Sequence, residues 1–387
     1  MSLILTLNAG SSSIKYSVYR QDDDEPNELI VGQVENLGPA ARLSMVASGD
    51  HNDHDISIEI GAANHALAVK AILKALEPYL RDEEVIGVGH RVVHGGVEFD
   101  QPVRLNEDII ERLTALKQLA PLHQPHNLAC INAAIATFPD AMQVACFDTG
   151  FHRGQPWVND TFAIPKRFYQ QGVRRYGFHG LSYDYISSEL TRSHADIANA
   201  KVVIAHLGNG ASMCAVVNGK SVGSTMGFSA LDGLPMGTRC GQLDPGVILY
   251  LMDQGRSSAE ISRILYKESG MKGLSGLTSD MRELLASELE DASKAIDYYV
   301  FRIQREVGAM AAILGGLDAL VFCGGIGENA AEIRFRIVEN LGFLGLEINR
   351  TANAKNDTVI NSGVTPILVI PTDEERVLAR AVDQLTK

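Results

Sequence analysis

The chain has 387 residues, of which 45% are hydrophobic and 21% are charged, and its formal net charge is −13. This length and composition predict an ordinary globular protein of about two domains. The acidic balance excludes a protein that wraps nucleic acid or binds an anionic membrane surface. It does not exclude phosphate ligands, which respond to local charge.

The cysteine pattern and the hydrophobic pattern indicate the compartment. Five cysteines lie far apart and form no C-x-x-C pair, so they predict neither a disulfide framework nor a zinc site. No run of about 18 apolar residues occurs, so we expect no membrane-spanning helix. No positive charge precedes Lys15, so we expect no signal peptide. Together these features predict a cytoplasmic protein.

The first structural signal is a pair of apolar segments, residues 3–7 and 14–19, joined by a polar turn at residues 8–13. Such a pattern predicts a β-hairpin. Gly10 lets the backbone approach a ligand closely, and the serines of the turn and Lys15 supply donors and a positive charge. The spacing is not that of a Walker loop. The turn is therefore either a phosphate-binding site or an ordinary solvated hairpin tip.

The rest of the first half alternates strands and helices. The pattern predicts strands within residues 29–60, a helix over 64–80, a helix capped by Asn106, a helix with Pro125 in its first turn, and a buried strand over 143–147 that ends at Asp148. This order is consistent with one α/β domain.

A second strand–turn–strand occupies residues 201–217, with its turn at residues 207–212. Like the first hairpin, it has an apolar strand, a turn of Gly, Asn, Ala and Ser, and an apolar return. Two such hairpins about 200 residues apart favour a duplicated domain, in which both turns would face one cleft and bind a polyphosphate. Coincidence between two glycine-rich hairpins is the alternative.

The second half is rich in helical periodicity. Residues 257–267 and 280–315 are predicted to be helical. Residues 297–314 are apolar on most faces, so we expect them to be buried in the core or in a subunit interface.

Near the end of the chain, a buried strand at residues 319–323 leads into a glycine-rich turn at 324–329, and a helix is predicted over 330–341. A strand followed by a glycine-rich turn and the N-terminus of a helix is typical of a nucleotide-binding site, although this sequence is not the dinucleotide G-x-G-x-x-G pattern. A last strand at 366–371 leads to the sequence Thr-Asp-Glu-Glu at 372–375, and a helix closes the chain.

Eight motifs follow one another along nearly the whole chain: N-x-G-S-S-S-x-K at 8–15, G-H-R-V-V-H-G-G at 89–96, F-D-T-x-F-H at 147–152, Y-G-F-H-G at 176–180, H-L-G-N-G-A-S at 206–212, G-L-P-M-G-T-R-C-G at 233–241, G-G-I-G-E-N at 324–329 and T-x-E-E at 372–375. With these motifs in this order, the sequence closely resembles the acetate kinase family. That family lies within the larger fold group of actin, sugar kinases and Hsp70-type ATPases.

The resemblance implies an α/β fold of duplicated ribonuclease H-like domains of the actin/hexokinase type. Each domain would hold a mixed sheet flanked by helices, with the active site in the interdomain cleft. The expected N-terminal domain, on the acceptor and phosphate side, is residues 1–149 with 376–387. The expected C-terminal domain, residues 150–375, would bind the nucleotide and carry the dimer interface.

The resemblance also implies a reversible, direct in-line transfer of the ATP γ-phosphoryl to acetate, giving acetyl phosphate and ADP, in a homodimer. Propionate, another short-chain fatty acid, is the alternative acceptor. No nucleic-acid or membrane partner is expected. Mg²⁺ is the expected metal ion, with Mn²⁺ as an alternative.

The family's functional positions carry over residue by residue. The catalytic positions match Arg91, Asp148, His179 and Arg239, and the acceptor-binding positions match Arg91, Val93, Leu122 and Phe178. The ATP-binding positions match Ser11, Ser13, Lys15, His206, Leu207, Gly208, Asn209, Gly210, Asp280, Met281, Arg282, Gly325, Ile326, Gly327, Glu328 and Asn329. The metal positions match Asn8 and Glu374, so we expect the final strand to pack close to the first hairpin, with Glu374 near Asn8.

The implied chemistry is mainly electrostatic. A carboxylate acceptor is already ionised at neutral pH, so it needs no strong general base, but it must approach a polyanion. Arg91 would hold the carboxylate, and His179 and Arg239 would stabilise the phosphoryl group in transfer. Asp148 matches the family's acid/base position, but we expect it to orient Arg91 or the attacking carboxylate.

Other interpretations remain open at the level of sequence. Read singly, Arg91 could pin a loop, His179 could be a core histidine and Glu374 could be a helix N-terminal acid. A sugar or polyol kinase of the same fold group would need a catalytic base for a neutral hydroxyl. A non-catalytic, ATP-gated binding protein would need no acceptor pocket. Ala230 also departs from the family, which has proline there, and we expect a wider pocket with weak discrimination against propionate.

Overall fold

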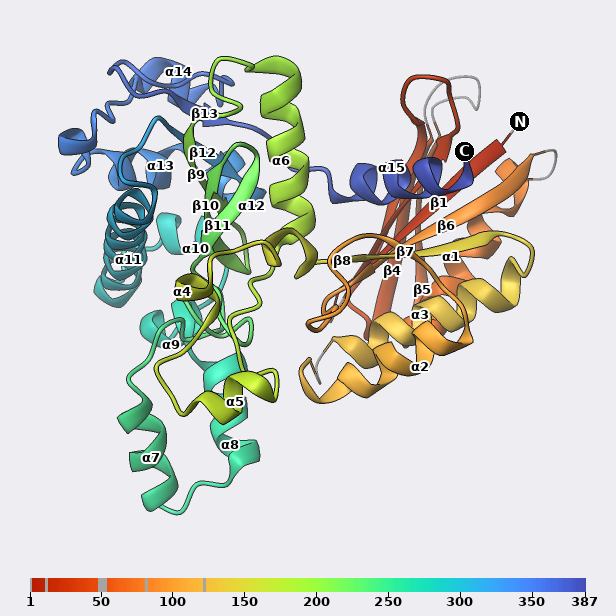
Figure 1. Ribbon diagram of the computed structural model, residues 1–387, viewed down its shortest axis with the longest axis horizontal. Helices are drawn as coiled ribbons and strands as arrows, with labels where there is room; N and C mark the ends of the chain where they lie inside the picture. The colour runs from red at the N-terminus through yellow and green to blue at the C-terminus, as the bar shows by residue number, and fades with distance from the viewer. Residues whose placement is uncertain (1, 11–12, 48–53, 81–82, 121–122) are drawn as a thin grey trace. The chain divides into compact units, whose positions relative to one another are not determined.

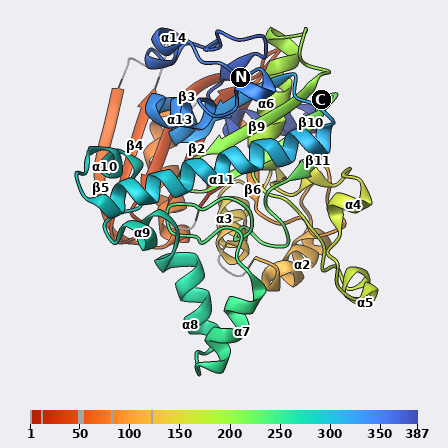
Figure 2. The same cartoon turned by 90° about the vertical axis from the view of Figure 1, so that its left-hand side faces the viewer.

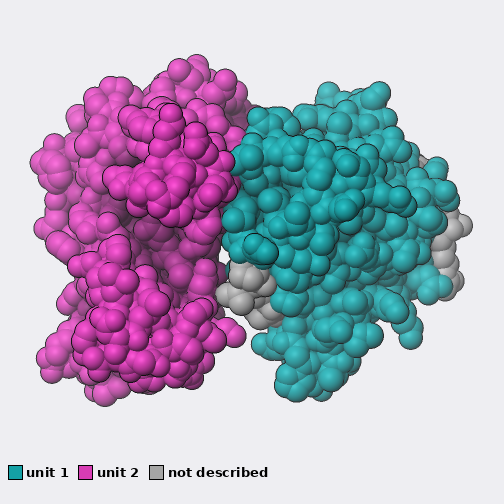
Figure 3. Space-filling model, turned by 60° about the horizontal axis from the view of Figure 1, so that its bottom comes forward, with its two compact units in different colours: residues 1–151, 373–387 teal, residues 152–372 magenta. Residues whose placement is uncertain are grey.

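The structure is a computed structural model that describes all residues except 1, 11–12, 48–53, 81–82 and 121–122. The chain divides into two compact units, which we call unit 1 (residues 1–151 and 373–387) and unit 2 (residues 152–372), coloured separately in Figure 3. Residues 150–151 and 373–375, which the sequence analysis assigns to the C-terminal domain, belong to unit 1. The reason at the second boundary is that the last helix begins at Glu374 and packs on strands of unit 1.

Unit 1 is built on one mixed sheet. Its strands are β1 (Ser2–Ala9), β2 (Ile14–Arg20), β3 (Asn27–Glu35), β4 (Gly38–Ala47), β5 (His54–Ala63), β6 (Glu84–Val92), β7 (Val103–Arg104) and β8 (Met142–Phe147). Their order across the sheet is β5-β4-β3-β2-β1-β6-β8-β7. Strands β1 to β5 form an antiparallel meander, whereas β1, β6 and β8 run parallel. The carboxyl ends of three neighbouring strands therefore meet at one edge.

Helices cover both faces of this sheet. They are α1 (His65–Leu80), α2 (Glu107–Ala115), α3 (Gln124–Thr137) and α15 (Glu374–Thr386). Figure 1 shows α1 and α3 on one face and α15 on the other, where α15 contacts β1, β6 and β8. Asn106 caps α2 by accepting a hydrogen bond from the N–H of Ile109 at 2.8 Å, and Pro125 lies in the first turn of α3, as predicted.

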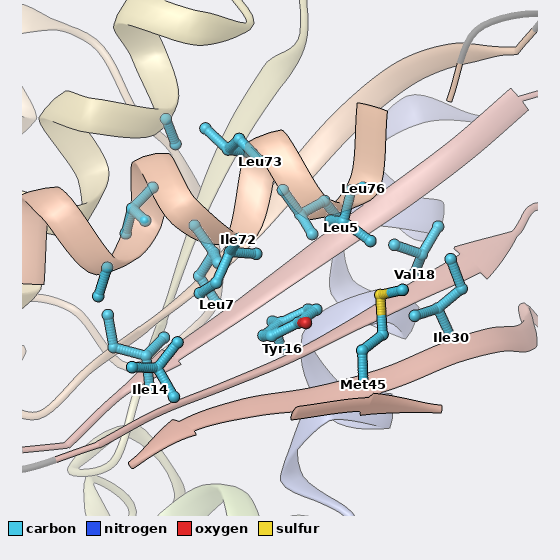
Figure 4. Close-up of a cluster of buried hydrophobic side chains, with 14 of the residues drawn as sticks. Leu5, Leu7, Ile14, Tyr16, Val18, Ile30, Met45, Ile72, Leu73 and Leu76 are labelled. Carbon is cyan, nitrogen blue, oxygen red and sulfur yellow. The ribbon is translucent and has the colours of Figure 1, made fainter. Parts of the chain in front are cut away.

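The core of unit 1 lies between the meander and α1. Alternate residues of each strand point to this side, and apolar residues of α1 recur at helical spacing. Figure 4 shows side chains of this cluster, among them Leu5, Leu7, Ile14, Tyr16, Val18, Ile30, Met45, Ile72, Leu73 and Leu76.

Unit 2 holds the second sheet, whose strands are β9 (Lys201–Leu207), β10 (Ala211–Val217), β11 (Lys220–Ser224), β12 (Ala319–Cys323) and β13 (Ile367–Val369). The order is β11-β10-β9-β12-β13. Strand β10 is antiparallel to both of its neighbours, β9 and β11, whereas β9, β12 and β13 run parallel to one another.

The two sheets share one topology. The series β3-β2-β1-β6-β8 of unit 1 has the same order and the same strand directions as β11-β10-β9-β12-β13 of unit 2. The turn between β1 and β2 is therefore equivalent to the turn between β9 and β10. The prediction of a duplicated α/β fold from these two turns is confirmed.

The helices of unit 2 are α4 (Trp157–Asp160), α5 (Lys166–Gln170), α6 (Gly180–Ser193), α7 (Pro245–Asp253), α8 (Ser258–Arg263), α9 (Gly270–Ser275), α10 (Met281–Ala286), α11 (Glu290–Leu314), α12 (Gly324–Asn329), α13 (Ala331–Val338) and α14 (Arg350–Ala354). Helix α11 packs along β9, β10 and β11, and it crosses in front of the sheet in Figure 2. Within the described residues, no helix is long and apolar enough to span a bilayer.

Three sequence predictions for unit 2 need correction. The single helix expected over 280–315 is broken between α10 and α11, because the backbone at Ser287 and Leu289 is extended. Complete burial of residues 297–314 in the core is wrong, since Phe301 is 60% exposed and Ile313 is 43% exposed; the interface alternative stays a prediction. The segment 324–329 is helical rather than an open turn, because Gly324 makes the chain reversal with φ of +75° and the helix starts there.

One buried histidine of β6 gives the fold a pH dependence. His90 has 1% of its surface exposed, and its Nε2 lies 2.8 Å from Oε1 of Gln143 on β8. Burial lowers the pKa of His90 from 6.5 to about 4, and the hydrogen bond opposes this shift. The unfolded chain therefore binds a proton at His90 in a range where the folded chain does not. The stability from neutral His90 is complete above about pH 6.5 and is lost as the pH falls toward about 4.

We predict that His90→Gln weakens the acid sensitivity of unfolding, because glutamine takes up no proton in the unfolded state. Thermal unfolding midpoints at about pH 7 and about pH 5 should differ less for His90→Gln than for the wild type. His194→Gln, at the end of α6, is the matched control and should keep the wild-type difference. Equal pH differences in the wild type and in His90→Gln would contradict the prediction.

Candidate functional site

The first group of predicted site residues lies at the carboxyl edge of the unit 1 sheet. Asn8 is near the end of β1, Arg91 is near the end of β6, and Asp148 directly follows β8. Glu374 and Glu375 form the first turn of α15, which packs on the same three strands. We call these five residues the Arg91 cluster. In open α/β sheets, this edge is where ligands bind.

The strongest contact of the cluster is a bidentate ion pair. Nε of Arg91 donates to Oδ1 of Asp148 at 2.9 Å, and Nη2 donates to Oδ2 at 2.6 Å. Asp148 is 1% exposed, and the Arg91 side chain is 17% exposed. Both carboxylate oxygens are thus engaged by one guanidinium. This geometry supports the orienting role that we expect for Asp148.

Asn8 links Arg91 to the last helix. Its Oδ1 accepts from Nη1 of Arg91 at 3.0 Å, and its Nδ2 donates to Oε2 of Glu374 at 3.0 Å and to Oε1 of Glu375 at 2.9 Å. The expected proximity of Glu374 to Asn8 is confirmed, whereas the expected packing of the final strand near the first hairpin stays a prediction, because that strand, β13, belongs to the sheet of unit 2. These bonds also fix the amide orientation, because a flipped amide would turn its N–H groups toward Arg91 and its oxygen toward two carboxylates.

The guanidinium keeps donors for a further acceptor. The three hydrogen bonds to Asp148 and Asn8 use three of its five N–H groups, which leaves one on each terminal nitrogen. Two N–H groups on neighbouring nitrogens suit the two oxygens of a carboxylate. Arg91 therefore has the chemistry to bind an anionic ligand while it stays paired with Asp148.

Burial and charge shift the pKa values of the cluster. Burial raises the pKa of Asp148, and Arg91 opposes that shift. Burial works against the charged form of Arg91, but Asp148 and Glu374 outweigh it, so the pKa of Arg91 is raised. Burial is also the main cause of the raised pKa of Glu375, with Lys15 opposing it. Arg91 therefore stays charged at neutral pH beside three carboxyl groups.

The cluster fits Mg²⁺ better through Glu374 than through Asn8. Mg²⁺ takes oxygen ligands, and it is usually held by one or two carboxylates together with waters and substrate phosphates. The Glu374 side chain supplies such oxygens and is 13% exposed. The Asn8 oxygen already accepts from Arg91, so Asn8 is placed to orient Glu374. Among the described residues, no group of three or more His, Cys, Asp or Glu side chains could hold a metal.

Three other residues predicted for the site, Val93, Lys15 and Ser13, are described in unit 1. Val93 is buried, and its N–H donates to Oδ1 of Asn127 at 3.1 Å, while Nδ2 of Asn127 donates to the carbonyl of Ala9 at 3.0 Å. Lys15 is exposed and lies opposite Asn8 in the register of strands β1 and β2. The carbonyl of Ser13 accepts from the N–H of Gly10 at 2.8 Å. Ser11 and Leu122 lie outside the described residues.

The second group of site residues lies in unit 2, where His179 precedes α6. His179 has φ of +57°, a backbone conformation that non-glycine residues rarely adopt and that is common at functional sites. Its Nδ1 lies 2.8 Å from Oγ of Ser212, and its ring stacks on His206 with 4.3 Å between the centroids. Its Nε2 is close to the turn between β9 and β10: if Gly210 carried a Cβ atom, that atom would lie 3.3 Å from Nε2.

Arg239 reaches the same turn from another loop. A Cβ at Gly210 would lie 3.9 Å from Nη1 of Arg239, and the N–H of Gly237 donates to the carbonyl of Asn209 at 3.0 Å. Nη1 of Arg239 also donates to the carbonyl of Ala230 at 3.2 Å. The structure thus brings His179, Arg239 and the glycine turn together. We call His179, His206, Gly208–Gly210 and Arg239 the His179 cluster.

Two hydroxyl groups lie behind the cluster. Oγ1 of Thr372 donates to Oγ of Ser182 at 2.8 Å, and Oγ of Ser182 lies 2.8 Å from Nδ1 of His206. Nε2 of His206 lies on the side of Gly208, because a Cβ at Gly208 would lie 3.9 Å from it.

The proposed adenosine-binding residues lie beside this turn. A Cβ at Gly208 would be 3.9 Å from the N of Gly325, at the start of α12. Glu328 is used within the protein, since its Oε1 accepts from the N–H of Gly324 at 2.8 Å and from that of Thr372 at 3.1 Å. Asn329 donates to the carbonyl of Gly325 at 3.0 Å.

Asp280–Arg282 form the start of α10. Asp280 caps this helix and pairs with Arg282, and these hydrogen bonds lower the pKa of Asp280 to about 2. The preceding residue, Ser279, is close to the loop of Arg239, because a Cβ at Gly237 would lie 3.2 Å from its Cβ. The predicted ATP-binding segments of unit 2 are therefore neighbours.

The residues predicted to bind the acceptor come from both units. Val93 belongs to unit 1, whereas Phe178 and Ala230 belong to unit 2. Phe178 is buried, and its carbonyl accepts from Nε2 of His152 at 2.9 Å.

No role is predicted for His152 from the sequence, although it ends the motif F-D-T-x-F-H. Because a carbonyl only accepts, its Nε2 carries the proton, and its Nδ1 accepts from Oγ of Ser221 at 2.8 Å. Burial lowers the pKa of His152 to about 4, which keeps the ring neutral. His152 thereby holds the carbonyl of Phe178, the residue before His179. The only sequence signal for this role of His152 is its place in the motif. The sequence likewise predicts no role for Asn127 or Glu375.

Comparisons with known proteins show the family of the chain. The model of the acetokinase family matches residues 3–380. An acetate kinase from Methylocella silvestris is 50% identical over 388 residues, which cover 97% of this chain and 96% of that protein. A solved propionate kinase from Francisella tularensis has a TM-score of 0.91 at 37% identity and covers 98% of this chain and 99% of its own. A solved acetate kinase from Porphyromonas gingivalis has a TM-score of 0.89 at 35% identity over the whole of both chains. The chain therefore belongs to the acetokinase family.

Proposed function

We propose that the protein is an acetate kinase, which transfers the γ-phosphoryl group of ATP to acetate and gives acetyl phosphate and ADP. The observation that carries this proposal is Arg91, which is held by both oxygens of Asp148 and keeps an N–H on each terminal nitrogen for a carboxylate. Family membership across residues 3–380 supports the same reaction.

In the proposed reaction, one oxygen of acetate forms a bond to the γ-phosphorus, and the bond from that phosphorus to the β,γ-bridging oxygen breaks. The bonding electrons stay on ADP, and no proton is transferred. Arg91 orients the carboxylate, and the donors of His179 and Arg239 stabilise the charge on the phosphoryl oxygens in flight. Mg²⁺, when bound through Glu374, neutralises phosphate charge.

The nucleotide would be held by unit 2 together with the first hairpin. His206–Gly210 supply donors to the phosphates, and the proposal assigns the adenosine to Asp280–Arg282 and Gly325–Asn329. Ser11, Ser13 and Lys15 are assigned to the phosphates from unit 1. This division follows from the shared strand–turn–strand of the two units, whose turns carry the donors.

We further propose a cytoplasmic location, because all five cysteines are free thiols in the structure, as in a reducing compartment.

The first test is to trap the acyl phosphate with hydroxylamine in the presence of ATP, Mg²⁺ and acids from formate to butyrate. We expect acetyl hydroxamate from the wild type. Arg239→Ala should lower kcat by at least about a hundredfold with little change in the KM for ATP, because its guanidinium acts mainly in the transition state. Arg192→Ala, an exposed arginine of α6, is the control and should retain activity. No hydroxamate from any acid would refute the proposed function.

The second test concerns the acceptor. The carbonyl of Ala230 accepts from Arg239, so this residue adjoins a proposed catalytic group, and alanine has a smaller side chain than the proline of the family. We expect the wild type to use both acetate and propionate, with kcat/KM values that differ by no more than about 200-fold, since one methylene is worth about 1–3 kcal/mol. Ala230→Pro keeps the carbonyl and should raise the preference for acetate. Absence of propionate turnover by the wild type at saturating ATP and Mg²⁺ would contradict this prediction.

The third test concerns the homodimer. Helix α7 has no buried residue, and its apolar side chains Val247, Leu249, Tyr250 and Met252 are 40–62% exposed. Such a helix is typical of a surface that a partner covers, and we propose that a second copy of the chain covers it. Sedimentation should show a dimer for the wild type and a shift to monomer for Leu249→Glu. Phe343→Glu, at a residue 77% exposed elsewhere on unit 2, should stay dimeric. A monomeric wild type would refute the proposal.

A further inference from the structure

Arg334 of α13 is a completely buried arginine that pairs with no carboxylate among the described residues. Its exposed fraction is 0%, and it is the largest of the fully buried side chains. Its Nε donates to Oδ1 of Asn353 at 2.8 Å, and its Nη1 donates to the carbonyls of Gly327 and Glu328 at 2.8 and 2.9 Å. Its Nη2 donates to the carbonyl of Asn353 at 2.8 Å and to Oδ1 of Asn356 at 2.6 Å.

These five hydrogen bonds equal the five N–H groups of a guanidinium, so every donor of Arg334 is used within the protein. All five acceptors are neutral. Burial lowers the pKa of Arg334 to about 10, which still leaves it charged at neutral pH. Burying a charge without a counter-charge is costly, and here only fixed carbonyl dipoles compensate it. The acceptors are thereby held in one arrangement.

Two of these acceptors belong to α12, which has only six residues. The last carbonyls of a helix have no partner within the helix, and in so short a helix they make up most of its acceptors. Arg334 supplies the missing donors to Gly327 and Glu328, while the Glu328 side chain accepts from the N–H of Gly324 at the other end. Helix α12 is thus fixed at both ends by side chains. Asn353 adds a link, since its Nδ2 donates to the carbonyl of Ala331 at 2.8 Å.

We propose that Arg334 is a positioning residue for the nucleotide. It acts through the backbone of α12, whose N-terminal end lies beside the glycine turn of the His179 cluster, and it does not itself contact ATP. This inference rests on the proposed function, in which Gly325–Asn329 hold the adenosine. Lysine cannot replace the arginine there, because an ammonium has three donors at one point and cannot span α12 and α14 together.

The experiment measures ADP affinity by calorimetry and the steady-state constants of Arg334→Lys. We expect the Kd for ADP and the KM for ATP to rise by about tenfold or more, while the KM for acetate changes by less than about twofold. Asn356→Gly removes one acceptor and suits the positive φ of 55° at that position, so it should shift nucleotide affinity in the same direction by a smaller factor. It also keeps the inference testable if Arg334→Lys fails to fold.

Arg302→Lys is the matched control. Arg302 is buried in α11 with 8% exposure, and it donates to Tyr298 and Gln242 rather than to α12. We expect this variant to lose thermal stability but to keep the wild-type Kd for ADP. Unchanged ADP affinity in both Arg334→Lys and Asn356→Gly would overturn the inference. Because ADP binding is measured without turnover, that result is distinct from a wild type that makes no acyl phosphate.

Discussion

The bidentate pair between Arg91 and Asp148 is the constraint on which unit 1 depends. A guanidinium with 17% exposure and a carboxylate with 1% exposure are stable at a sheet edge only if each satisfies the other. The pair ties the end of β6 to the end of β8, and Asn8 extends it to β1 and to the first turn of α15. The amide of Asn8 thus binds Glu374, which lies 366 positions further along the chain. The same contacts that anchor the last helix therefore also orient the proposed acceptor-binding group.

The partly exposed Arg91 and the fully buried Arg334 are satisfied in opposite ways, and the difference matches their proposed roles. Arg91 is paired with a carboxylate, which compensates its charge with three N–H groups and leaves two for a ligand. Arg334 meets only neutral oxygens, which use all five of its N–H groups and leave none. A group that binds a ligand needs spare donors and partial exposure, whereas a group that fixes a backbone needs neither.

Sequence reasoning predicted the parts of the fold that local signals encode. The turns at residues 8–13 and 207–212, the cap at Asn106 and the duplicated topology follow from turn residues, hydrophobic period and the likeness of two segments. It was less successful where contacts between residues far apart in the sequence determine the local structure or the role of a side chain. Helix α12 starts at Gly324, where the chain reverses with φ of +75° and the N–H donates to the side chain of Glu328, and a glycine-rich segment carries no sign of that contact. The roles of Asn127 and His152 likewise arise from partners that are far away in sequence.

The geometry also bears on whether Asp148 acts as a base. A general base needs an oxygen that can reach the proton it takes, but both oxygens of Asp148 accept from Arg91. Burial raises the pKa of this carboxyl, which would make it a better base in isolation, and the ion pair acts against that shift. The acceptor in the proposed reaction has no proton to give, because an acid with a pKa near 4 is ionised at neutral pH. A fully engaged carboxylate and a proton-free reaction are therefore consistent with each other. The requirement that remains is to hold one anion close to another, which is the property that a fixed guanidinium supplies.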